Sequence, residues 1–345
     1  MSSLGVGVLL AIIAGIMNGA FATPTKYVKS WKWENIWAVW AIMGMVVFPW
    51  LAVMLTIPNA ASVYQTAGLK TLLLVIVFGV GFGLAQIFFG LGIAAIGIAL
   101  NFAIAIGMAT ALGSLVPLLV LQRQRIFTPQ GHMIFLGVGV IILGIVGCAA
   151  AGAAKEKHLA ATTERPREST AVKMSFKAGL IICILAGIGS PFNNFGLAFG
   201  KPLIDAAVGQ GAGPGSQANI IWAPLNTAAL IPYLIYCAYL WKKNGSAKLF
   251  GAPGTGLNWV FGAVMGLLWF GSTVIYGGIA ARLADMGPIL GWPLFMSAII
   301  VASNAVGIVT GEWKGAGAKA LGTMLGAIVL LIGGFATLAL ASRLG

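Results

Sequence analysis

The stretch "GIGSPFNNFG" places a serine, a proline and two asparagines inside an otherwise apolar run of the chain. Ser190, Asn193 and Asn194 each carry groups that donate and accept hydrogen bonds. Such groups are costly in an apolar environment unless they are paired or hydrated. Their neutral chemistry suits a ligand with hydroxyl groups, and Ser190 with Pro191 predicts a break in the helix beside them. We take these three polar residues as candidate ligand-binding residues.

Similar polar side chains occur in other apolar runs, together with aromatic rings. The further candidates are Asn18, Gln86, Asn101, Thr273 and Asn304, with Trp269, Tyr276 and Trp292 as aromatic neighbours. Amides exchange paired hydrogen bonds with hydroxyls while rings cover apolar C–H surface, so the set favours a neutral sugar. For each amide or hydroxyl the alternative is an interhelical hydrogen bond, worth about 1 kcal/mol or less. For Trp292 the alternative is a place at the membrane interface.

Charged groups are missing from the middle of the apolar runs. The chain has seven acidic residues, and none lies at the centre of such a run; no Lys or Arg lies there either. A cationic or phosphorylated ligand would need a buried counter-charge, so the expected ligand is uncharged. No nucleophile has a general base beside it, and no spacing is typical of a metal site, so we expect no enzyme activity, catalytic residue, cofactor or metal.

The composition indicates that these residues lie on helices inside a membrane. The chain is 59% hydrophobic and 8% charged, with a net charge of +13, whereas about a quarter of the residues in soluble domains are charged. The basic residues are dispersed among loops and form no single stripe, so we do not expect nucleic acid as a partner. The expected partner is the lipid bilayer.

Ten apolar runs are long enough to cross a bilayer, which requires about 20 residues each. They are 4–22, 36–57, 72–93, 99–121, 133–151, 178–199, 218–240, 259–279, 289–309 and 320–341. The sequence therefore predicts an all-α integral membrane protein with ten transmembrane helices.

The two halves of the chain resemble each other. At a spacing of 172 residues, Ala14, Gly15, Ile16 and Lys29 recur as Ala186, Gly187, Ile188 and Lys201, and at a slightly different offset Gly79, Phe82 and Gly90 align with Gly266, Trp269 and Gly277. Five spans is an odd number, so the second copy would enter the membrane from the opposite face, as in many secondary transporters.

We therefore predict a five-helix repeat at 1–151, a charged cytoplasmic linker at 152–177 and an inverted five-helix repeat at 178–345. In such proteins the substrate site lies near the midplane, on helices that are interrupted by Gly or Pro. The first and sixth spans fit this description.

The loops differ in basic residues. Fourteen of the twenty Lys and Arg residues fall in one set of alternate loops, and six fall on the other side. Because basic residues favour the cytoplasmic side, the first set is predicted to be cytoplasmic and both termini to lie outside.

Several stretches carry a family resemblance that covers nearly the whole chain. They are "TPTKYVKSWKWENIWAVW", the "PW" at 49–50, "GLGIAAIGIALNFAIAIGMATALGSLVP", the pair Lys201 and Pro202, and "GEWKGAG" at 311–317. In this order they resemble the L-rhamnose-proton symporter family of the drug/metabolite transporter superfamily. The resemblance implies the drug/metabolite transporter fold and a bacterial inner-membrane importer of L-rhamnose or a related deoxyhexose, driven by protons through alternating access.

The resemblance also implies roles for acidic residues. Glu34 and Glu312 match the family's two motif acids, and both lie at predicted cytoplasmic helix ends near Lys29. Ion pairs between such acids and lysines would form a gate that latches the inward-closed state. The alternative is that these are solvated helix ends of little energetic weight.

One departure concerns the proton carrier. The family pattern implies a histidine near the end of span eight and an aspartate near the start of span nine, where this chain has Ala280 or a neighbour and Pro288. Asp285 lies three residues from Pro288, and it could substitute as a coupling residue paired with Arg282, or simply cap a helix. The sugar, the coupling ion and the oligomeric state are left open.

Two other functions remain open from the sequence. An exporter of another neutral or zwitterionic metabolite would use the same alternating-access machine. A membrane sensor that does not transport would bind its ligand without flux, although such a protein would be expected to carry a cytoplasmic signalling domain.

Overall fold

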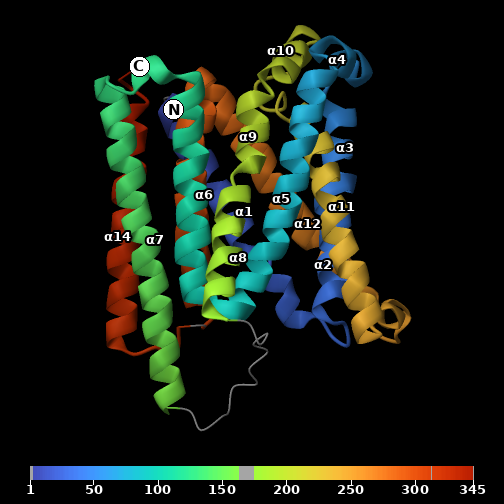
Figure 1. Ribbon diagram of the computed structural model, residues 1–345, viewed down its shortest axis with the longest axis vertical. Coiled ribbons are helices and arrows are strands. Elements are labelled where there is room, and N and C mark those ends of the chain that lie inside the picture. Colours follow the sequence, from blue (N-terminus) through green and yellow to red (C-terminus); the bar gives the residue numbers. More distant parts are fainter. Residues whose placement is uncertain (1–2, 163–174, 312, 345) are drawn as a thin grey trace. The chain divides into compact units, whose positions relative to one another are not determined.

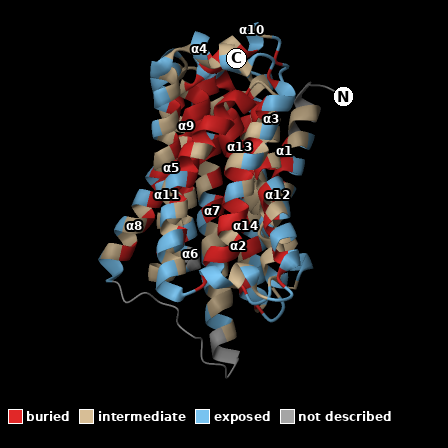
Figure 2. Cartoon of the chain, turned by 90° about the vertical axis from the view of Figure 1, so that its right-hand side faces the viewer, coloured by how far each residue is buried: buried red, intermediate tan, exposed pale blue. Residues whose placement is uncertain are grey.

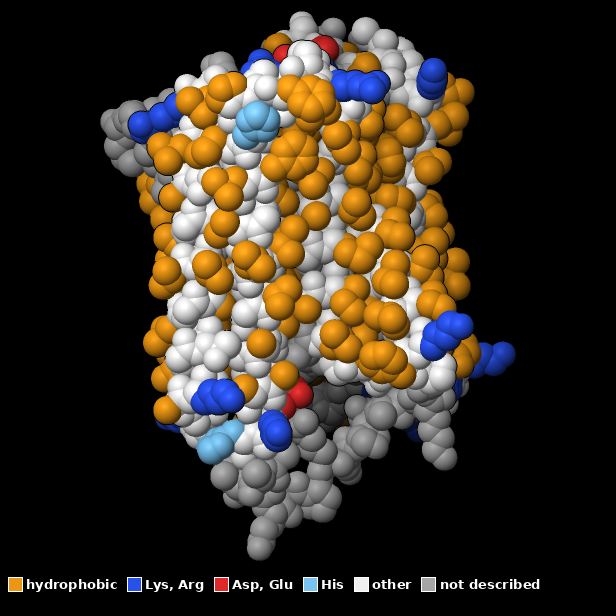
Figure 3. All heavy atoms as spheres, turned by 60° about the vertical axis from the view of Figure 1, so that its left-hand side comes forward, with side chains coloured by type: hydrophobic (Ala, Val, Ile, Leu, Met, Phe, Trp, Pro, Cys, Tyr) orange, Lys and Arg blue, Asp and Glu red, His pale blue; other side chains and the backbone are white. Residues whose placement is uncertain are grey.

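A computed structural model describes residues 3–162, 175–311 and 313–344 of the chain. Ten helical segments of the described residues are long and apolar enough to cross a membrane, which confirms the number of predicted spans. Some of them join consecutive helices, as at Trp33–Thr56 and Phe176–Phe199. Throughout the described residues the regular structure is helical. On the face drawn in Figure 3, hydrophobic side chains form a broad band, and Lys and Arg side chains gather toward its two ends. This distribution fits a chain that spans a bilayer.

The α-helices follow one another along the chain as shown in Figure 1. They are α1 (Ser3–Ala20), α2 (Trp33–Ile42), α3 (Phe48–Thr56), α4 (Ala60–Ala67), α5 (Leu69–Ile96), α6 (Ile98–Leu121), α7 (Pro129–Thr162), α8 (Phe176–Gly189), α9 (Phe192–Phe199), α10 (Lys201–Gly209), α11 (Asn219–Asn244), α12 (Gly256–Arg282), α13 (Trp292–Val309) and α14 (Ala318–Ala341). Short 3₁₀ segments are η1 (Thr23–Tyr27), η3 (Arg123–Arg125), η4 (Ala247–Gly251) and η5 (Ala284–Met286), and π-helical segments are η2 (Met43–Val47) and η6 (Gly287–Gly291).

The helix break in the sixth span is confirmed. Helix α8 ends at Gly189, and α9 begins at Phe192 after a turn at Ser190 and Pro191. Proline lacks the N–H that would continue the backbone ladder, which explains the position of the turn. The first span does not share this interruption, because α1 is one unbroken helix from Ser3 to Ala20; glycine alone does not end a helix.

Helix α7 extends further than the apolar run that predicts it. It continues to Thr162, so the first part of the expected 152–177 linker is helical, and residues 163–174 lie outside the described part of the chain. The sequence "AAKEKHLAA" is polar but rich in good helix formers, so the helix outlasts the hydrophobic stretch. Hydropathy marks where a segment leaves an apolar environment, and helix propensity continues beyond it.

The chain forms two compact units, each drawn from both halves of the sequence. Unit 1 comprises Met1–Leu84 and Phe192–Gly287, and unit 2 comprises Ala85–Pro191 and Pro288–Gly345. These units group residues that lie close in space, whereas the predicted repeats 1–151 and 178–345 describe a duplication within the sequence. The division into repeats therefore stays a prediction. The chain changes unit within α5, at the break before α9 and within η6.

Glycines allow the helices of unit 1 to approach closely. A Cβ added at Gly79 or Gly83 of α5 would overlap backbone carbonyls of α11, at Leu225 and Ala229 respectively. In the same unit a Cβ at Gly44 would lie 3.2 Å from the Cα of Gly266 on α12. Small residues at helix interfaces let backbones pack closely where burial from water supplies no driving force.

Unit 2 contains an extended helix pair, α7 and α14, which run side by side in Figure 1. Gly137 and Gly144 of α7 face Leu338 and Leu331 of α14. These leucines are fully buried, and the glycines leave the space that their branched side chains fill.

Two prolines leave backbone carbonyls without their helical donors, and a hydroxyl group pairs with each. Pro293 cannot donate to Ile289 O, which instead accepts from Ser114 Oγ at 2.7 Å. In unit 1, Pro224 cannot donate to Ile220 O, which accepts from the Tyr64 hydroxyl at 3.0 Å. The apolar pattern of the sequence predicts neither of these pairings. It also does not predict the π-helical segments η2 and η6, which end two residues before Pro49 and Pro293.

Candidate functional site

The interior of unit 1 holds three asparagines beside two aromatic residues. We call this group the amide cluster: Asn193, Asn194, Trp222, Asn226 and Tyr276. The side chains come from α9, α11 and α12, and all are at least 95% buried. Helix α9 carries buried residues along most of its length (Figure 2). The break before α9 lets a polar segment begin inside an apolar unit, where its amides need partners.

Hydrogen bonds link the members of the amide cluster. The Tyr276 hydroxyl donates to Asn194 Oδ1, and Asn193 Nδ2 donates to Asn226 Oδ1 at 3.5 Å. The Trp222 ring lies against Tyr276, with 6.2 Å between ring centroids. Asn193, Asn194 and Tyr276 were expected from the sequence and are brought together here. Asn226 was missed, although an asparagine in the apolar stretch "APLNTAALIP" carries the same signal as the others.

A second feature of unit 1 joins α1 to α12. Asn18 Nδ2 donates to Ser272 Oγ at 2.8 Å, and Ser272 Oγ donates to Trp269 O at 2.6 Å. Thr273 donates its hydroxyl to the same carbonyl at 3.2 Å. The Ser272 and Thr273 hydroxyl protons are therefore used within their own helix, while the oxygen of Ser272 holds the Asn18 amide.

Trp269 lies in a group of rings that we call the aromatic cluster: Phe21, Trp37, Trp40, Phe82, Tyr233 and Trp269. Trp40 is its centre, with 5.3 Å between its centroid and that of Trp269 and 5.1 Å to that of Trp37. Phe82 is stacked on Trp269 with an interplanar angle of 16°. The sequence indicated Trp269 but not Trp40, whose depth depends on helix phase.

The remaining candidates of the ligand-binding set lie in unit 2. Asn101 is fully buried; its Nδ2 donates to Phe89 O at 3.2 Å, and its Oδ1 accepts from Cys183 Sγ at 2.9 Å. Trp292 is buried rather than interfacial, and its Nε1 donates to Ala109 O at 2.9 Å. Both side chains hold helices of unit 2 together. For Asn101 this matches the interhelical alternative, whereas Trp292 does not lie at the membrane interface, as its alternative supposed.

Three further candidates of unit 2 are less buried. Ser190 donates its hydroxyl to Ala186 O at 2.7 Å, within its own helix. Asn304 donates to Ile300 O at 2.9 Å and has Cys148 Sγ at 3.8 Å. Gln86 is half-buried on α5.

A family model described as L-rhamnose-proton symport protein (RhaT) matches residues 1–342. The chain belongs to the L-rhamnose-proton symport family. It is also similar to curated proteins named L-rhamnose-proton symporter: 28% identical over 339 residues to those of Salmonella typhi and Citrobacter koseri, and 27% to one of Escherichia coli. Each alignment covers 96% of this chain and 96% of the relative. The family consists of membrane transporters, not enzymes.

In this member of the L-rhamnose-proton symport family, Glu34 lies at the start of α2 with only 3% of its surface exposed. Its Oε1 accepts from Ser246 Oγ at 2.5 Å and from Asn244 Nδ2 at 2.9 Å. The Lys29 side chain is exposed, and its backbone N–H and C=O both bond to the side chain of Asn258. Among the described residues Glu34 forms no ion pair with Lys29. The predicted partner acid, Glu312, lies outside the described residues.

The contacts of Glu34 therefore fasten α2 to the last residue of α11 and to the loop that follows it, all within unit 1. We expect Glu34→Ala to lower the free energy of unfolding by about 1.5–3 kcal/mol, because a charged acceptor of two hydrogen bonds is lost. Thermal melting in detergent measures this. The control is Asp205→Asn, which removes an exposed ion pair of low value. Normal melting combined with lost transport would instead favour the gate predicted from the family motif.

The acids near α10 are solvent-exposed. Asp285 on η5 does not pair with Arg282 in the described part of the chain; Arg282 Nη1 donates to Gly278 O at 2.7 Å. Lys201 Nζ lies 2.8 Å from Asp205 Oδ1, and this hydrogen bond raises the pKa of Lys201. The charge of Asp285 adds to that shift, which places Asp285 near Lys201. The predicted pairing of Asp285 with Arg282 was wrong. The predicted role of Asp285 in coupling stays a prediction.

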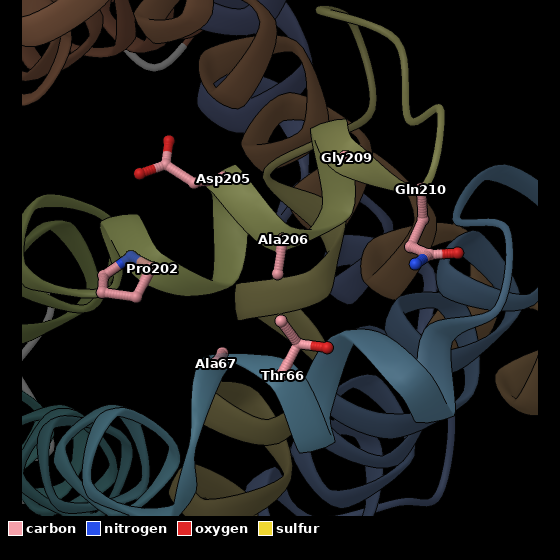
Figure 4. Close-up of a pocket in the computed structure, with 7 residues that line it drawn as sticks. All are labelled: Thr66, Ala67, Pro202, Asp205, Ala206, Gly209 and Gln210. Carbon is pink, nitrogen blue, oxygen red and sulfur yellow. The ribbon is translucent and has the colours of Figure 1, made fainter.

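A pocket of about 510 Å³ opens between α4 and α10, two short helices that the hydropathy pattern does not reveal. Figure 4 shows its lining residues, with Thr66 and Ala206 pointing toward each other and the Asp205 carboxylate pointing away. Gln210 at its edge accepts from Asn59 Nδ2 at 3.2 Å. The pocket is open and mixed in polarity, whereas the amide cluster is buried. Within the described residues, His, Cys, Asp and Glu form no group that could hold a metal ion.

Proposed function

We propose that this protein imports L-rhamnose or a related deoxyhexose across the bacterial inner membrane together with protons. The observation that carries the proposal is the family match over residues 1–342, supported by relatives named L-rhamnose-proton symporter. The amide cluster agrees with it chemically. Neutral amides and a hydroxyl beside aromatic rings suit a sugar, which has hydroxyl groups and apolar C–H faces.

The proposed architecture is the drug/metabolite transporter fold, with inverted five-helix repeats at 1–151 and 178–345. Two contacts within unit 1 support it. Gly79 and Gly266, which align between the halves, take part in equivalent approaches: the first against Leu225 of α11, the second against Gly44 beside α2. Phe82 and Trp269, which also align, stack on each other with 6.4 Å between ring centroids. Residues related by a two-fold axis meet in this way when they lie close to the axis.

The proposed sugar site combines the amide cluster with Trp269 and the Asn18 region of unit 1. Gln86, Asn101, Ser190, Trp292 and Asn304, which belong to unit 2, stay ligand-binding residues predicted from the sequence. The proposed orientation places the Lys29 loop in the cytoplasm and both termini outside, because basic residues concentrate in that set of loops. Alternating access then exposes the site to each side in turn.

The test is uptake of labelled L-rhamnose into proteoliposomes, with and without an imposed inward proton gradient. Unlabelled hexoses, pentoses and neutral amino acids serve as competitors. We expect saturable uptake that the proton gradient accelerates and that deoxyhexoses inhibit. Uptake that ignores the gradient would reject proton coupling. Absence of L-rhamnose uptake from an active preparation would reject the substrate, and inhibition by amino acids alone would favour another neutral metabolite.

A further inference from the structure

Four buried N–H donors have no hydrogen-bond acceptor among the described residues, and all belong to unit 1. They are Trp40 Nε1, Trp222 Nε1, Asn226 Nδ2 and Trp241 Nε1. Buried donors in folded proteins are paired almost without exception, and an unpaired one destabilises the state that contains it. An unpaired buried donor therefore needs an explanation. One explanation is that a bound ligand supplies the acceptor.

Two of the four donors stand together. Trp222 and Asn226 are four residues apart on α11, so their side chains lie on the same helix face. Both have no exposed surface, and both belong to the amide cluster through Tyr276 and Asn193. Pairs at this spacing can address neighbouring oxygen atoms of one small molecule. Trp241 lies near the end of the same helix, against the Phe250 ring at 5.5 Å, and is separate from this pair.

The contacts already made within the cluster do not satisfy these donors. Asn194 Oδ1 accepts from Tyr276, and Asn226 Oδ1 accepts from Asn193. Exchanging the oxygen and nitrogen of the Asn226 amide alone would set two NH₂ groups against each other. Gly277 of α12 lies beside Trp222 Nε1, and a Cβ there would be 3.3 Å from that nitrogen, so position 277 contributes no side chain beside it.

The missing acceptor belongs to a neutral molecule. The cluster contains amide, hydroxyl and indole groups and no charged side chain. A phosphate or carboxylate would enter this apolar interior without a counter-charge, which is costly. A sugar hydroxyl accepts from an N–H and donates to an amide oxygen, so it can pair with both sides of an asparagine.

We propose that Trp222 Nε1 and Asn226 Nδ2 donate hydrogen bonds to oxygen atoms of the transported sugar. The inference rests on the proposed function, and it adds two specificity-determining donors on α11. In the sugar-free protein these donors are unpaired and cost stability. In the loaded protein they are paired, which gives affinity for hydroxylated ligands over apolar ones of the same size.

The test compares Trp222→Phe and Asn226→Leu with Trp241→Phe in the full chain purified in detergent. Phenylalanine keeps an aromatic ring and removes the N–H donor of Trp222. Leucine keeps the approximate volume of Asn226 but removes both its Nδ2 donor and the Oδ1 that accepts from Asn193. Binding of L-rhamnose is measured by calorimetry, and thermal melting is measured without and with L-rhamnose. We expect the Kd for L-rhamnose to rise about tenfold in Trp222→Phe and in Asn226→Leu, because each variant loses a hydrogen bond to the ligand and leaves a sugar oxygen unpaired. Trp241→Phe is expected to keep the wild-type Kd.

The sugar-free melting temperature gives a second readout. Removing the unpaired Trp222 donor is expected to leave it unchanged or to raise it, whereas Asn226→Leu is expected to lower it, because the buried Asn193 Nδ2 loses its acceptor. A large loss of stability in Trp222→Phe, or its failure to fold, would show that this donor serves the fold and would overturn the inference. Unchanged Kd in both variants would also overturn it while leaving the proposed function intact. If the wild-type protein does not bind L-rhamnose, the proposed substrate fails and this inference fails with it.

Discussion

A single methyl group added at Gly83 is expected to separate α5 from α11 and to abolish transport. In Gly83→Ala the new Cβ would overlap the backbone carbonyl of Ala229, and backbone cannot turn aside as a flexible side chain does. Overpacking of a well-packed interior costs roughly 1–3 kcal/mol, and a clash with backbone lies at the upper end of that range. Thermal melting in detergent and L-rhamnose uptake in proteoliposomes measure the two consequences.

The matched control lies on the same helix. At Gly90 of α5 an added Cβ would meet no atom within 4 Å. Gly90→Ala is therefore expected to keep transport and to gain slightly in stability, because Ala is favoured over Gly in a helix by about 0.5–1 kcal/mol. Equal melting temperatures for the two variants would refute the close approach of α5 and α11.

The second large effect is expected at Tyr276. In Tyr276→Phe the ring keeps its place beside Trp222, but the hydroxyl that donates to Asn194 is lost. The Asn194 amide then loses one hydrogen-bond partner, and the KM for L-rhamnose is expected to rise about tenfold, since the loss of a hydrogen bond by a buried amide costs about 1–3 kcal/mol. Transport kinetics in proteoliposomes over a range of sugar concentrations measure the change.

Tyr64→Phe is the control for the loss of a tyrosine hydroxyl. The Tyr64 hydroxyl donates to the carbonyl of Ile220, which Pro224 leaves without a helical donor. Its loss is expected to lower the melting temperature and to leave the KM unchanged. If Tyr276→Phe behaved in the same way, the Asn194 pair would be structural and would not belong to the sugar site.

The spans and the helix break could be predicted from the sequence, because lipid imposes long apolar runs and proline interrupts a helix. The short helices α4 and α10, of eight and nine residues, could not be predicted from hydropathy. They do not need to cross a membrane, and so their composition is not constrained in the same way. The π-helical segment η2 is likewise hidden, because the residues Met43–Val47 resemble any apolar turn.

The candidate site was only partly predictable. Asn193 and Asn194 were identified because amides are rare and costly in apolar runs. The same signal could not separate Asn101, which bonds to Phe89 and Cys183, from Asn226, which keeps an unpaired donor. That difference depends on which face of the helix carries the residue, and a one-residue error in phase rotates a side chain by about 100°.

The mixed origin of the two units sets the order in which the protein can be built. Unit 1 requires Phe192–Gly287, and in unit 2 α7 packs along α14, the last helix of the chain. During synthesis α7 therefore enters the membrane well before its partner exists, with the glycine face at Gly137 and Gly144 uncovered. Neither unit can close on a chain that stops after the fifth span. Insertion must therefore precede compaction, and a truncated chain would present its unfilled helix faces to quality-control proteases.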